Sequence, residues 1–210
     1  MPHARSRIGG GTPMKAQHPA VSAVLNEPAD LPFSDRDRSS IGLEQTTSPS
    51  LARALAIGCL SGLNPEMTRV DIWDPAAGSG YAGEMLVRAL DSTGIRVRYR
   101  GQDINDGAVA ASRRRFERFA DAEIAQADTL ADDPFSDFRA DLVIVDSPWG
   151  LDWRGSVSAV QARAQRGEFL FGLPQGNDST WLFISLALEK LRPAAEGGED
   201  GSPRSLRQAR

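Results

Sequence analysis

The sequence predicts an α/β fold in which helices cover a parallel sheet. Between residues 69 and 145, segments typical of strands alternate with segments typical of helices, and the last strand, 141–145, is apolar almost throughout. Strands that are buried on both faces have this continuous apolar character, and the alternation with helices is typical of parallel sheets. Acidic residues also stand at or just after four strand ends, the edge where such folds bind ligands: Asp74, Asp103, Asp128 and Asp146.

The first ordered element is expected to be a helix that begins at Pro49. Ser48 is a good N-cap, and proline is favoured at the first helical position. Apolar residues then recur at the spacing of an amphipathic helix. The later elements follow from apolar runs, helical periodicity and glycine or proline breaks. In chain order we expect strand 69–73, helix 84–90, strand 97–102, helix 108–119, strands 123–127 and 141–145, and helix 179–191.

The domain organisation predicted from composition is one catalytic domain, 46–193, between two disordered segments. Residues 1–45 are rich in Gly, Pro, Ser and Arg without sustained apolar periodicity, and 194–210 have a similar polar character. About 25 polar residues after Asp146 are expected to form a long loop beside the site. Because no strand pattern follows the last helix, we expect the sheet to be incomplete at its C-terminal side.

The composition excludes several classes of chemistry. The 28 acidic and 24 basic residues give a net charge of −4, which argues against a free-standing electrostatic DNA clamp. The single cysteine, Cys59, and two histidines near the N-terminus, His3 and His18, exclude a disulfide framework and a Ser-His-Asp triad, and no metal site is expected. Because no apolar stretch reaches the about 20 residues of a membrane span, we expect a cytoplasmic protein without a membrane partner.

The glycine turn after the first strand permits two interpretations. Residues 78–83 satisfy the pattern G-x-G-x-x-G, and Asp103 follows at a spacing that suits a ribose contact, as in an NAD-dependent oxidoreductase. In that class, however, the strand runs almost directly into the first glycine, whereas Asp-Pro-Ala-Ala intervenes here at 74–77. A carboxylate at the strand tip repels a pyrophosphate and attracts an ammonium group. We therefore favour a zwitterionic ligand that carries adenosine, and the oxidoreductase stays as an alternative.

Several motifs resemble those of N6-adenine DNA methyltransferases. Asp-Pro-Ala-Ala-Gly-Ser-Gly at 74–80 is similar to their cofactor motif, which usually has cysteine in fourth place, and Gly-Gln-Asp-Ile-Asn at 101–105 is similar to a second segment. Thr47-Ser48-Pro49 resembles a segment of the modification subunits of type I restriction systems. The resemblance to actinobacterial-type N-6 DNA methylases is carried by Trp153, Arg163 and Phe171-Gly172-Leu173-Pro174. The resemblance implies a Rossmann-like class I S-adenosylmethionine-dependent methyltransferase. Because no later strands are expected, we favour a truncated member over one in which a partner chain supplies those strands.

S-adenosylmethionine is the cofactor that this resemblance implies. The family's acid at the place of Asp103 holds both ribose hydroxyls, and Asp128 falls where an aspartate contacts the adenine edge of the cofactor. Asp74 is expected to attract the ammonium of the methionine portion, directly or through water. The complete set of expected cofactor-binding residues is Thr47, Asp74, Ala76, Gly78, Gly80, Asp103 and Asp128.

The tetrapeptide Asp146-Ser147-Pro148-Trp149 resembles the family's catalytic motif, Asn/Asp-Pro-Pro-Tyr/Phe/Trp, with serine in place of the first proline. By this resemblance the Asp146 carboxylate and the Ser147 carbonyl accept the two N–H bonds of the adenine N6 amine, and Trp149 stacks on the flipped base. The expected activity is methyl transfer to adenine N6 in DNA. Serine leaves φ free where proline would fix it, so we expect this activity to be weakened or lost.

The tetrapeptide alone does not distinguish DNA from other substrates. RNA and protein amides also present a planar conjugated nitrogen, so a methyltransferase that acts on RNA or a protein amide stays an alternative. The sequence has no separate segment with the character of a target-recognition domain. We therefore expect DNA as one partner and a specificity subunit, or another subunit, as the source of target recognition in a restriction-modification system.

Overall fold

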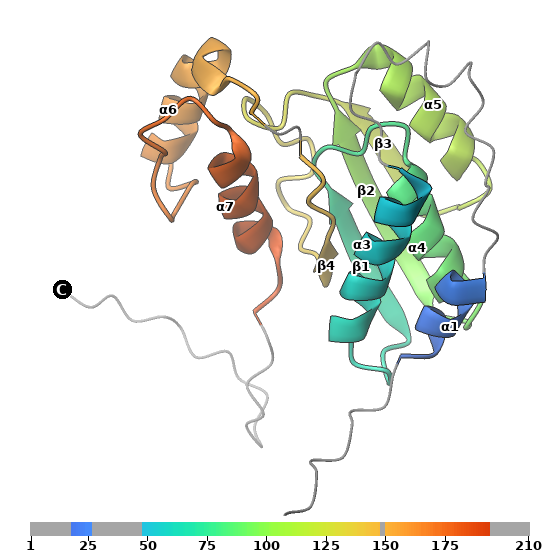
Figure 1. The fold of residues 1–210 in the computed structure, drawn as a ribbon. Coiled ribbons are helices and arrows are strands. Elements are labelled where there is room, and N and C mark those ends of the chain that lie inside the picture. The colour runs from blue at the N-terminus through green and yellow to red at the C-terminus, as the bar shows by residue number, and fades with distance from the viewer. Residues whose placement is uncertain (1–17, 27–47, 148–149, 194–210) are drawn as a thin grey trace, which may run out of the picture.

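A four-stranded parallel sheet forms the centre of the computed structural model, which describes residues 18–26, 48–147 and 150–193 (Figure 1). The strands are β1 (Arg69–Asp74), β2 (Arg96–Asp103), β3 (Ala122–Gln126) and β4 (Leu142–Val143). Their order is β3-β2-β1-β4, and each neighbouring pair is parallel. The predicted parallel sheet in an α/β fold is therefore confirmed.

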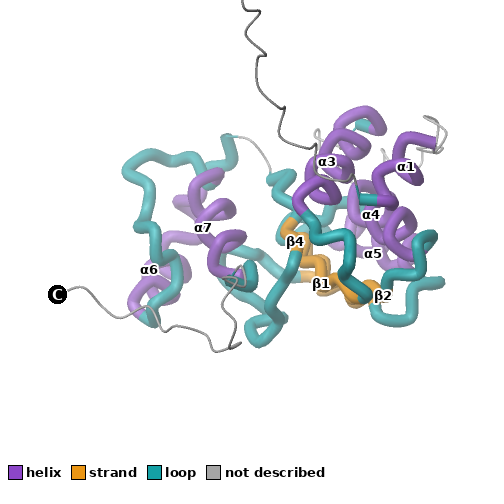
Figure 2. The backbone as a smooth tube through the Cα atoms, turned by 90° about the horizontal axis from the view of Figure 1, so that it is seen from below, coloured by secondary structure: helices purple, strands orange, loops and turns teal. Residues whose placement is uncertain are grey.

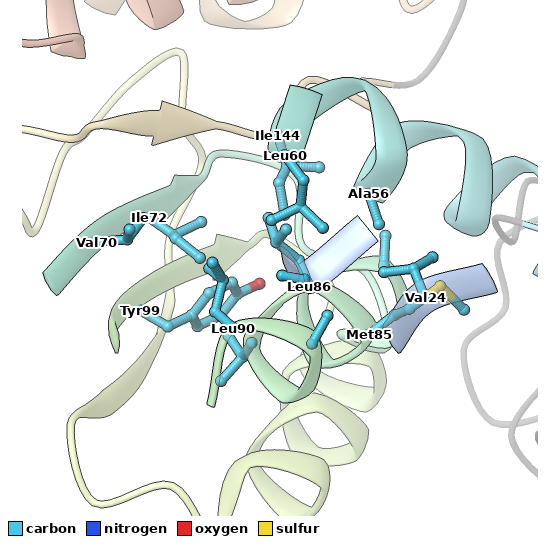
Figure 3. Close-up of a cluster of buried hydrophobic side chains, with 14 of the residues drawn as sticks. Val24, Ala56, Leu60, Val70, Ile72, Met85, Leu86, Leu90, Tyr99 and Ile144 are labelled. Carbon is cyan, nitrogen blue, oxygen red and sulfur yellow. The ribbon is translucent and has the colours of Figure 1, made fainter. Parts of the chain in front are cut away.

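One face of the sheet is covered by four helices, which Figure 2 shows together on one side of β1 and β2. Val70 and Ile72 of β1 are fully buried against this layer, as the alternation of side chains along a strand requires. Tyr99 of β2 belongs to the same cluster, drawn in Figure 3. The covering helices are α1 (Pro19–Asn26), α3 (Pro49–Gly62), α4 (Tyr81–Asp91) and α5 (Asp106–Phe116).

A second apolar cluster lies on the opposite face. Trp73 of β1 packs there with Phe138, and both join residues of the segment that follows β4, including Trp153 and Leu182. Figures 1 and 2 show α6 and α7 beyond the β4 edge of the sheet. The elements of this segment are the 3₁₀ helix η1 (Trp153–Ser156), α6 (Val157–Gln165) and α7 (Thr180–Lys190). The sheet is thus packed on both faces, as parallel sheets require.

Helix α1 lies inside the segment that the sequence predicted to be disordered. Ala20, Val21 and Val24 are fully buried, and α1 contacts both α3 and α4. The Nδ1 atom of His18 accepts a hydrogen bond from the Ala20 amide at 3.2 Å, which satisfies one N–H at the start of the helix. The expectation of disorder is therefore wrong for residues 19–26. The rest of the predicted leader and the predicted tail, 194–210, lie outside the described residues.

The segment after Asp146 also differs from the predicted long loop, because it contains η1 and α6. Within α6 only Val160 and Arg163 are buried, so the helix lacks the apolar stripe by which sequence patterns identify helices. After α7, Leu191 forms a single parallel bridge with Ala140, on the approach to β4. The helices of the described segments do not combine the length and apolar character that crossing a membrane demands.

A buried ionic network stabilises the sheet at the start of the strands. Asp71 of β1, 1% exposed, pairs with Arg69 at 3.0 Å, with Arg98 at 2.7 Å and with Arg192. Arg192 also pairs with Asp141, whose Oδ2 accepts the Asp71 amide at 2.8 Å. Burial by itself would raise the pKa of Asp71, but the hydrogen bonds from the three arginines lower that pKa well below its ordinary range.

Candidate active site

The carboxyl ends of the four strands bring the predicted acidic residues to one edge of the sheet. Asp74 ends β1, Asp103 ends β2, and Asp128 follows β3 by two residues. The Ile144 amide donates to the Trp73 carbonyl at 3.0 Å, so Asp146 leaves the sheet beside the end of β1. The charges of Asp103 and Asp146 both act on the Asp74 carboxyl, which is consistent with a shared site.

Asp74 is the most deeply buried of these acids, with 2% of its surface exposed. Its Oδ2 accepts a hydrogen bond from the Tyr99 hydroxyl at 2.8 Å, while its buried Oδ1 accepts none from any residue in the described ranges. Burial raises the pKa of Asp74 to about 7, with the Asp103 and Asp146 charges acting in the same direction; the Tyr99 hydroxyl and the nearby Ala76 amide lower it. The ionised carboxyl therefore has an unused acceptor, which suits an ammonium held through a bridging water.

Tyr99 is a residue of this site that sequence reasoning missed. Its ring stacks on Phe116 at a centroid distance of 4.2 Å, and burial raises its pKa, so the hydroxyl stays a donor to Asp74. A Cβ at Gly83 of α4 would lie 2.5 Å from the Tyr99 hydroxyl oxygen. The third glycine of the G-x-G-x-x-G pattern therefore makes room for Tyr99. The available signal was the period-2 alternation of β2, which directs residue 99 to the buried face.

The turn between β1 and α4 depends on two glycines with positive φ. Gly78 has φ +53° and Gly80 has φ +79°, a conformation that other residues rarely adopt. A Cβ at Gly80 would lie 2.6 Å from the Ser112 hydroxyl, whereas a Cβ at Gly78 would meet nothing within 4 Å. The Gly78 amide donates to Asp103 Oδ2 at 2.8 Å, which fixes the turn against the end of β2. The space at Gly78 leaves the backbone open to a ligand.

Asp103 retains acceptor capacity after its contacts with the protein are counted. Its Oδ2 accepts from the Gly78 amide, and its Oδ1 accepts from the Asn105 amide at 2.9 Å. Asn105 in turn caps α5 by accepting from the Ala108 amide at 2.9 Å. Each carboxylate oxygen has two lone pairs, so both oxygens keep one acceptor position. This arrangement suits the two hydroxyls of a ribose.

The Asp128-Thr129 step is tied to the turn after β1 and to the segment after β4. The Thr129 hydroxyl donates to the Pro75 carbonyl, and the Thr129 carbonyl accepts from Arg163 Nη1 at 2.5 Å. Asp128 Oδ2 accepts from the Ser156 hydroxyl at 2.9 Å. Thr129, Ser156 and Arg163 were not predicted as site residues, because they are distant in sequence from the residues they contact.

The remaining predicted residues are only partly described. Asp146 is half-buried and Ser147 is buried, both just after β4, whereas Thr47, Pro148 and Trp149 lie outside the described residues. Ala76 is half-buried against the second apolar cluster. Across the described ranges, His, Cys, Asp and Glu side chains do not gather in groups of three or more that could hold a metal ion. The site thus combines an unpartnered buried carboxylate oxygen, a carboxylate with free acceptor positions and an open glycine turn, which fit a zwitterionic ligand that carries a ribose.

Comparisons with known proteins agree with this geometry. The family model for N-6 DNA methylase matches residues 51–198. A class I S-adenosylmethionine-dependent methyltransferase from Listeria monocytogenes is similar in structure, with 20% identity and a TM-score of 0.57 over 71% of this chain and 44% of that one. A type I restriction-modification methyltransferase subunit from Streptococcus thermophilus has 20% identity and a TM-score of 0.58 over 71% of this chain and 32% of that one.

The chain spans less than half the length of both of these structures. No curated protein matched the sequence. The two structures confirm the predicted class I methyltransferase fold. The family model covers well over half of the chain and therefore shows its family. The chain belongs to the N-6 DNA methylase family.

Proposed function

We propose that this chain carries the catalytic site of a DNA methyltransferase that methylates adenine at N6. The observation that carries the proposal is the convergence of the strand ends, where Asp146 and Ser147 follow β4 beside Asp74 of β1. S-adenosylmethionine is the cofactor, in agreement with the family and the fold. Family membership also favours methyl transfer over the oxidoreductase alternative.

We assign the cofactor contacts by the chemistry of each group. Asp103 accepts the ribose hydroxyls with its free lone pairs, and Asp128 accepts from the adenine edge. Asp74 attracts the ammonium through its unpartnered Oδ1. The open glycine turn allows close approach of the backbone. The complete proposed set is Thr47, Asp74, Ala76, Gly78, Gly80, Asp103 and Asp128.

The proposed catalytic step is direct methyl transfer to a neutral amine. The bound cofactor supplies a methyl group on a positively charged sulfur, which keeps the electron pair of the breaking C–S bond. The N6 lone pair is delocalised into the adenine ring, and acceptors on both N–H bonds make it more available. The Asp146 carboxylate and the Ser147 carbonyl provide these acceptors, and one N–H proton is released to solvent after transfer. Trp149 stacks on the base, which recovers about 1–3 kcal/mol of the cost of flipping, and Pro148 completes the proposed catalytic set.

Serine at position 147 is expected to lower the rate. Proline there would fix φ near −65° and would carry no N–H, whereas serine leaves the turn less preorganised by about 0.4–1 kcal/mol. Replacement of Ser147 with proline is therefore expected to increase methylation of adenine. A lower rate in this variant, with the fold intact by circular dichroism, would mean that the turn has a different geometry from that of the family.

The test is a product analysis on several substrates. The protein is incubated with unmethylated DNA, RNA or an unfolded protein and with S-adenosylmethionine labelled on the methyl group, and the products are hydrolysed and separated. We expect label in N6-methyladenine from DNA, and its loss in Asp146→Ala but not in Asp137→Ala, which changes an exposed aspartate. Label in cytosine, in RNA or in glutamine would contradict the proposal and identify the substrate class instead.

We propose that target recognition is supplied by a separate subunit. The S. thermophilus structure similar to this chain is a subunit of a type I restriction-modification system. The net charge of −4 gives this chain little non-specific attraction for DNA, so a partner that binds DNA would raise its local concentration. Methylation by the isolated chain is accordingly expected to need high DNA concentrations.

A further inference from the structure

The segment that follows the catalytic tetrapeptide turns back and contacts both residues of the Asp128-Thr129 step. The Ser156 hydroxyl, at the end of η1, donates to Asp128 Oδ2 at 2.9 Å. Arg163 of α6 donates from Nη1 to the Thr129 carbonyl at 2.5 Å. Because α6 begins directly after η1, one continuous helical segment makes both contacts.

The guanidinium of Arg163 is oriented by its surroundings. Arg163 is 3% exposed, and its Nε and Nη2 donate to Glu168 Oε2 at 2.8 and 2.5 Å. The Phe169 ring lies against the guanidinium, with its centroid 5.3 Å from Cζ. The rigid fork of the guanidinium then directs Nη1 to the Thr129 carbonyl. A buried charge with these fixed partners holds the backbone of the step in one place.

The same step is anchored on its other side to the cofactor motif. The Thr129 hydroxyl donates to the carbonyl of Pro75, which directly follows Asp74. Arg163, Thr129 and Pro75 thus connect α6 to the turn after β1. This connection fixes the distance between the Asp128 side chain and the glycine turn, the two parts that would enclose the adenosine.

The chemistry of Asp128 indicates which part of adenine it can recognise. The carboxylate is an acceptor, and the exocyclic amine is the hydrogen-bond donor that the adenine edge offers. Asp128 Oδ1 accepts from the Leu130 amide at 3.0 Å and Oδ2 accepts from Ser156, so the rotamer is fixed from both sides. The Ser156 hydroxyl therefore determines where the remaining acceptor positions of Asp128 point.

We propose that Ser156 and Arg163 are positioning residues, which fix the Asp128-Thr129 step so that Asp128 recognises the amino group of the cofactor's adenine. The proposal rests on the assignment of Asp128 under the proposed function and adds the residues that make it selective. Through this segment, the element that follows the catalytic tetrapeptide also takes part in cofactor selection.

The test compares two ligands that differ at the amino group. S-adenosylhomocysteine and S-inosylhomocysteine, in which oxygen replaces the amine, are titrated into the full chain by calorimetry. We expect the wild-type protein to prefer the adenosyl ligand, and Ser156→Ala to reduce this preference about five- to tenfold. Ser156→Thr keeps the hydroxyl and should restore the preference. Ser158→Ala, which changes an exposed serine of α6, should leave it unchanged.

Arg163 is tested in parallel with the same ligand pair. Arg163→Ala is expected to reduce the preference and the affinity, and Arg163→Lys to restore part of both, because lysine also donates to a carbonyl. If Arg163→Ala does not fold, as judged by circular dichroism, the Ser156 variants decide the question. They do so because the ratio of two affinities is unaffected by a general loss of stability.

Two results would overturn the proposal: no preference in the wild-type protein, or an unchanged preference in Ser156→Ala, whether both affinities stay the same or fall by the same factor. The methylation assay on DNA is independent of this comparison. A chain that selects the adenosyl ligand through Ser156 but methylates a different substrate would refute the proposed function and leave this inference intact.

Discussion

Replacing Asp74 with asparagine is expected to stabilise the cofactor-free protein increasingly as the pH rises from 5 to 8. Asparagine has nearly the same shape and can still accept the hydrogen bond from the Tyr99 hydroxyl, which reaches Asp74 Oδ2 at 2.8 Å. It removes the charge that the wild-type protein must bury next to Asp103 and Asp146. The same change should weaken cofactor binding, because the carboxylate that attracts the ammonium is lost.

The magnitude follows from the pKa of Asp74. Burial raises this pKa from 3.8 to about 7, which corresponds to about 4 kcal/mol at about 1.4 kcal/mol per pH unit. Between these two pH values the folded protein keeps a proton that the unfolded chain has lost, so the free energy of unfolding falls as the pH rises. About 2–3 kcal/mol of the effect lies between pH 5 and pH 8. The new amide nitrogen lacks an acceptor, and this cost is independent of pH.

The assay is urea unfolding, followed by circular dichroism at pH 5, 6, 7 and 8 without cofactor. The quantity of interest is the difference in the free energy of unfolding between Asp74→Asn and the wild-type protein, because titrating groups that do not interact with Asp74 cancel in it. This difference should shift by about 2–3 kcal/mol in favour of the variant from pH 5 to pH 8. Asp137→Asn, which alters an exposed aspartate, should show no such shift.

A difference that stays constant across this pH range would refute the reasoning. It would mean that Asp74 titrates in the folded protein as it does in the unfolded chain. In that case its buried Oδ1 has a partner such as a bound cation or water, and the unused acceptor would no longer support an ammonium site.

Three further predictions concern the packing of Gly83 in α4, the ribose contact and the ionic network. Gly83→Ala should destabilise the protein by about 1–3 kcal/mol in urea unfolding, because its Cβ would lie 2.5 Å from the Tyr99 hydroxyl oxygen. Gly58→Ala in α3, where nothing lies within 4 Å, should stabilise it by about 0.5–1 kcal/mol, and equal effects of the two would contradict the packing argument. Asp103→Ala should lower the affinity for S-adenosylhomocysteine about ten- to hundredfold in calorimetry, and unchanged binding would disprove the ribose contact. Asp71→Asn should lower the free energy of unfolding at pH 7 and less so at pH 3, because the low pKa of the folded carboxyl stabilises the protein only above the ordinary pKa of aspartate; a larger gap at pH 3 would contradict this.

Most elements of the sheet could be predicted because their patterns are local. The strand predicted at 123–127 is observed as Ala122–Gln126, and the strand predicted at 97–102 is observed as Arg96–Asp103. Ser48 caps α3 as expected, since its hydroxyl accepts from the Leu51 amide at 3.2 Å. Strand β4 is shorter than predicted, with only Leu142–Val143 in the ladder, although the run from 142 to 145 is apolar. An apolar run indicates burial, and the length of the ladder depends on the neighbouring strand.

The missed elements lack a sufficient local signal. Helix α1 has eight residues, so its apolar positions extend over about two turns, and its stability comes from packing on α3 and α4. Helix α6 buries Arg163, which pairs with Glu168 just after the helix and with the Thr129 carbonyl, 34 residues earlier in the chain. The apolar spacing by which helices are predicted does not detect a helix that buries an arginine, so this segment was predicted to be a long polar loop.

The candidate site residues that stand at strand ends or in a single motif could be predicted from the sequence. The acids at the strand ends followed from strand positions alone, and their convergence in the fold agrees with that prediction. The groups that position these acids could not be predicted from strand positions. Tyr99 reaches Asp74 across 25 residues, and Ser156 reaches Asp128 across 28. Contacts of this kind become visible only when the strand order is known.

The ionic network around Asp71 has a consequence for folding during synthesis. Arg192 is 121 residues from Asp71, and it connects the segment after α7 to the central strand and to Asp141. A ribosome therefore releases β1 long before the arginine that completes its charge balance has been made. Until then Asp71 has Arg69 and Arg98, and the approach to β4 lacks its contact with Leu191. We expect the nascent chain to fold the part from α1 to β3 first and to complete the β4 side only after residue 192 has emerged. The β4 side should therefore depend more on chaperones than the part from α1 to β3.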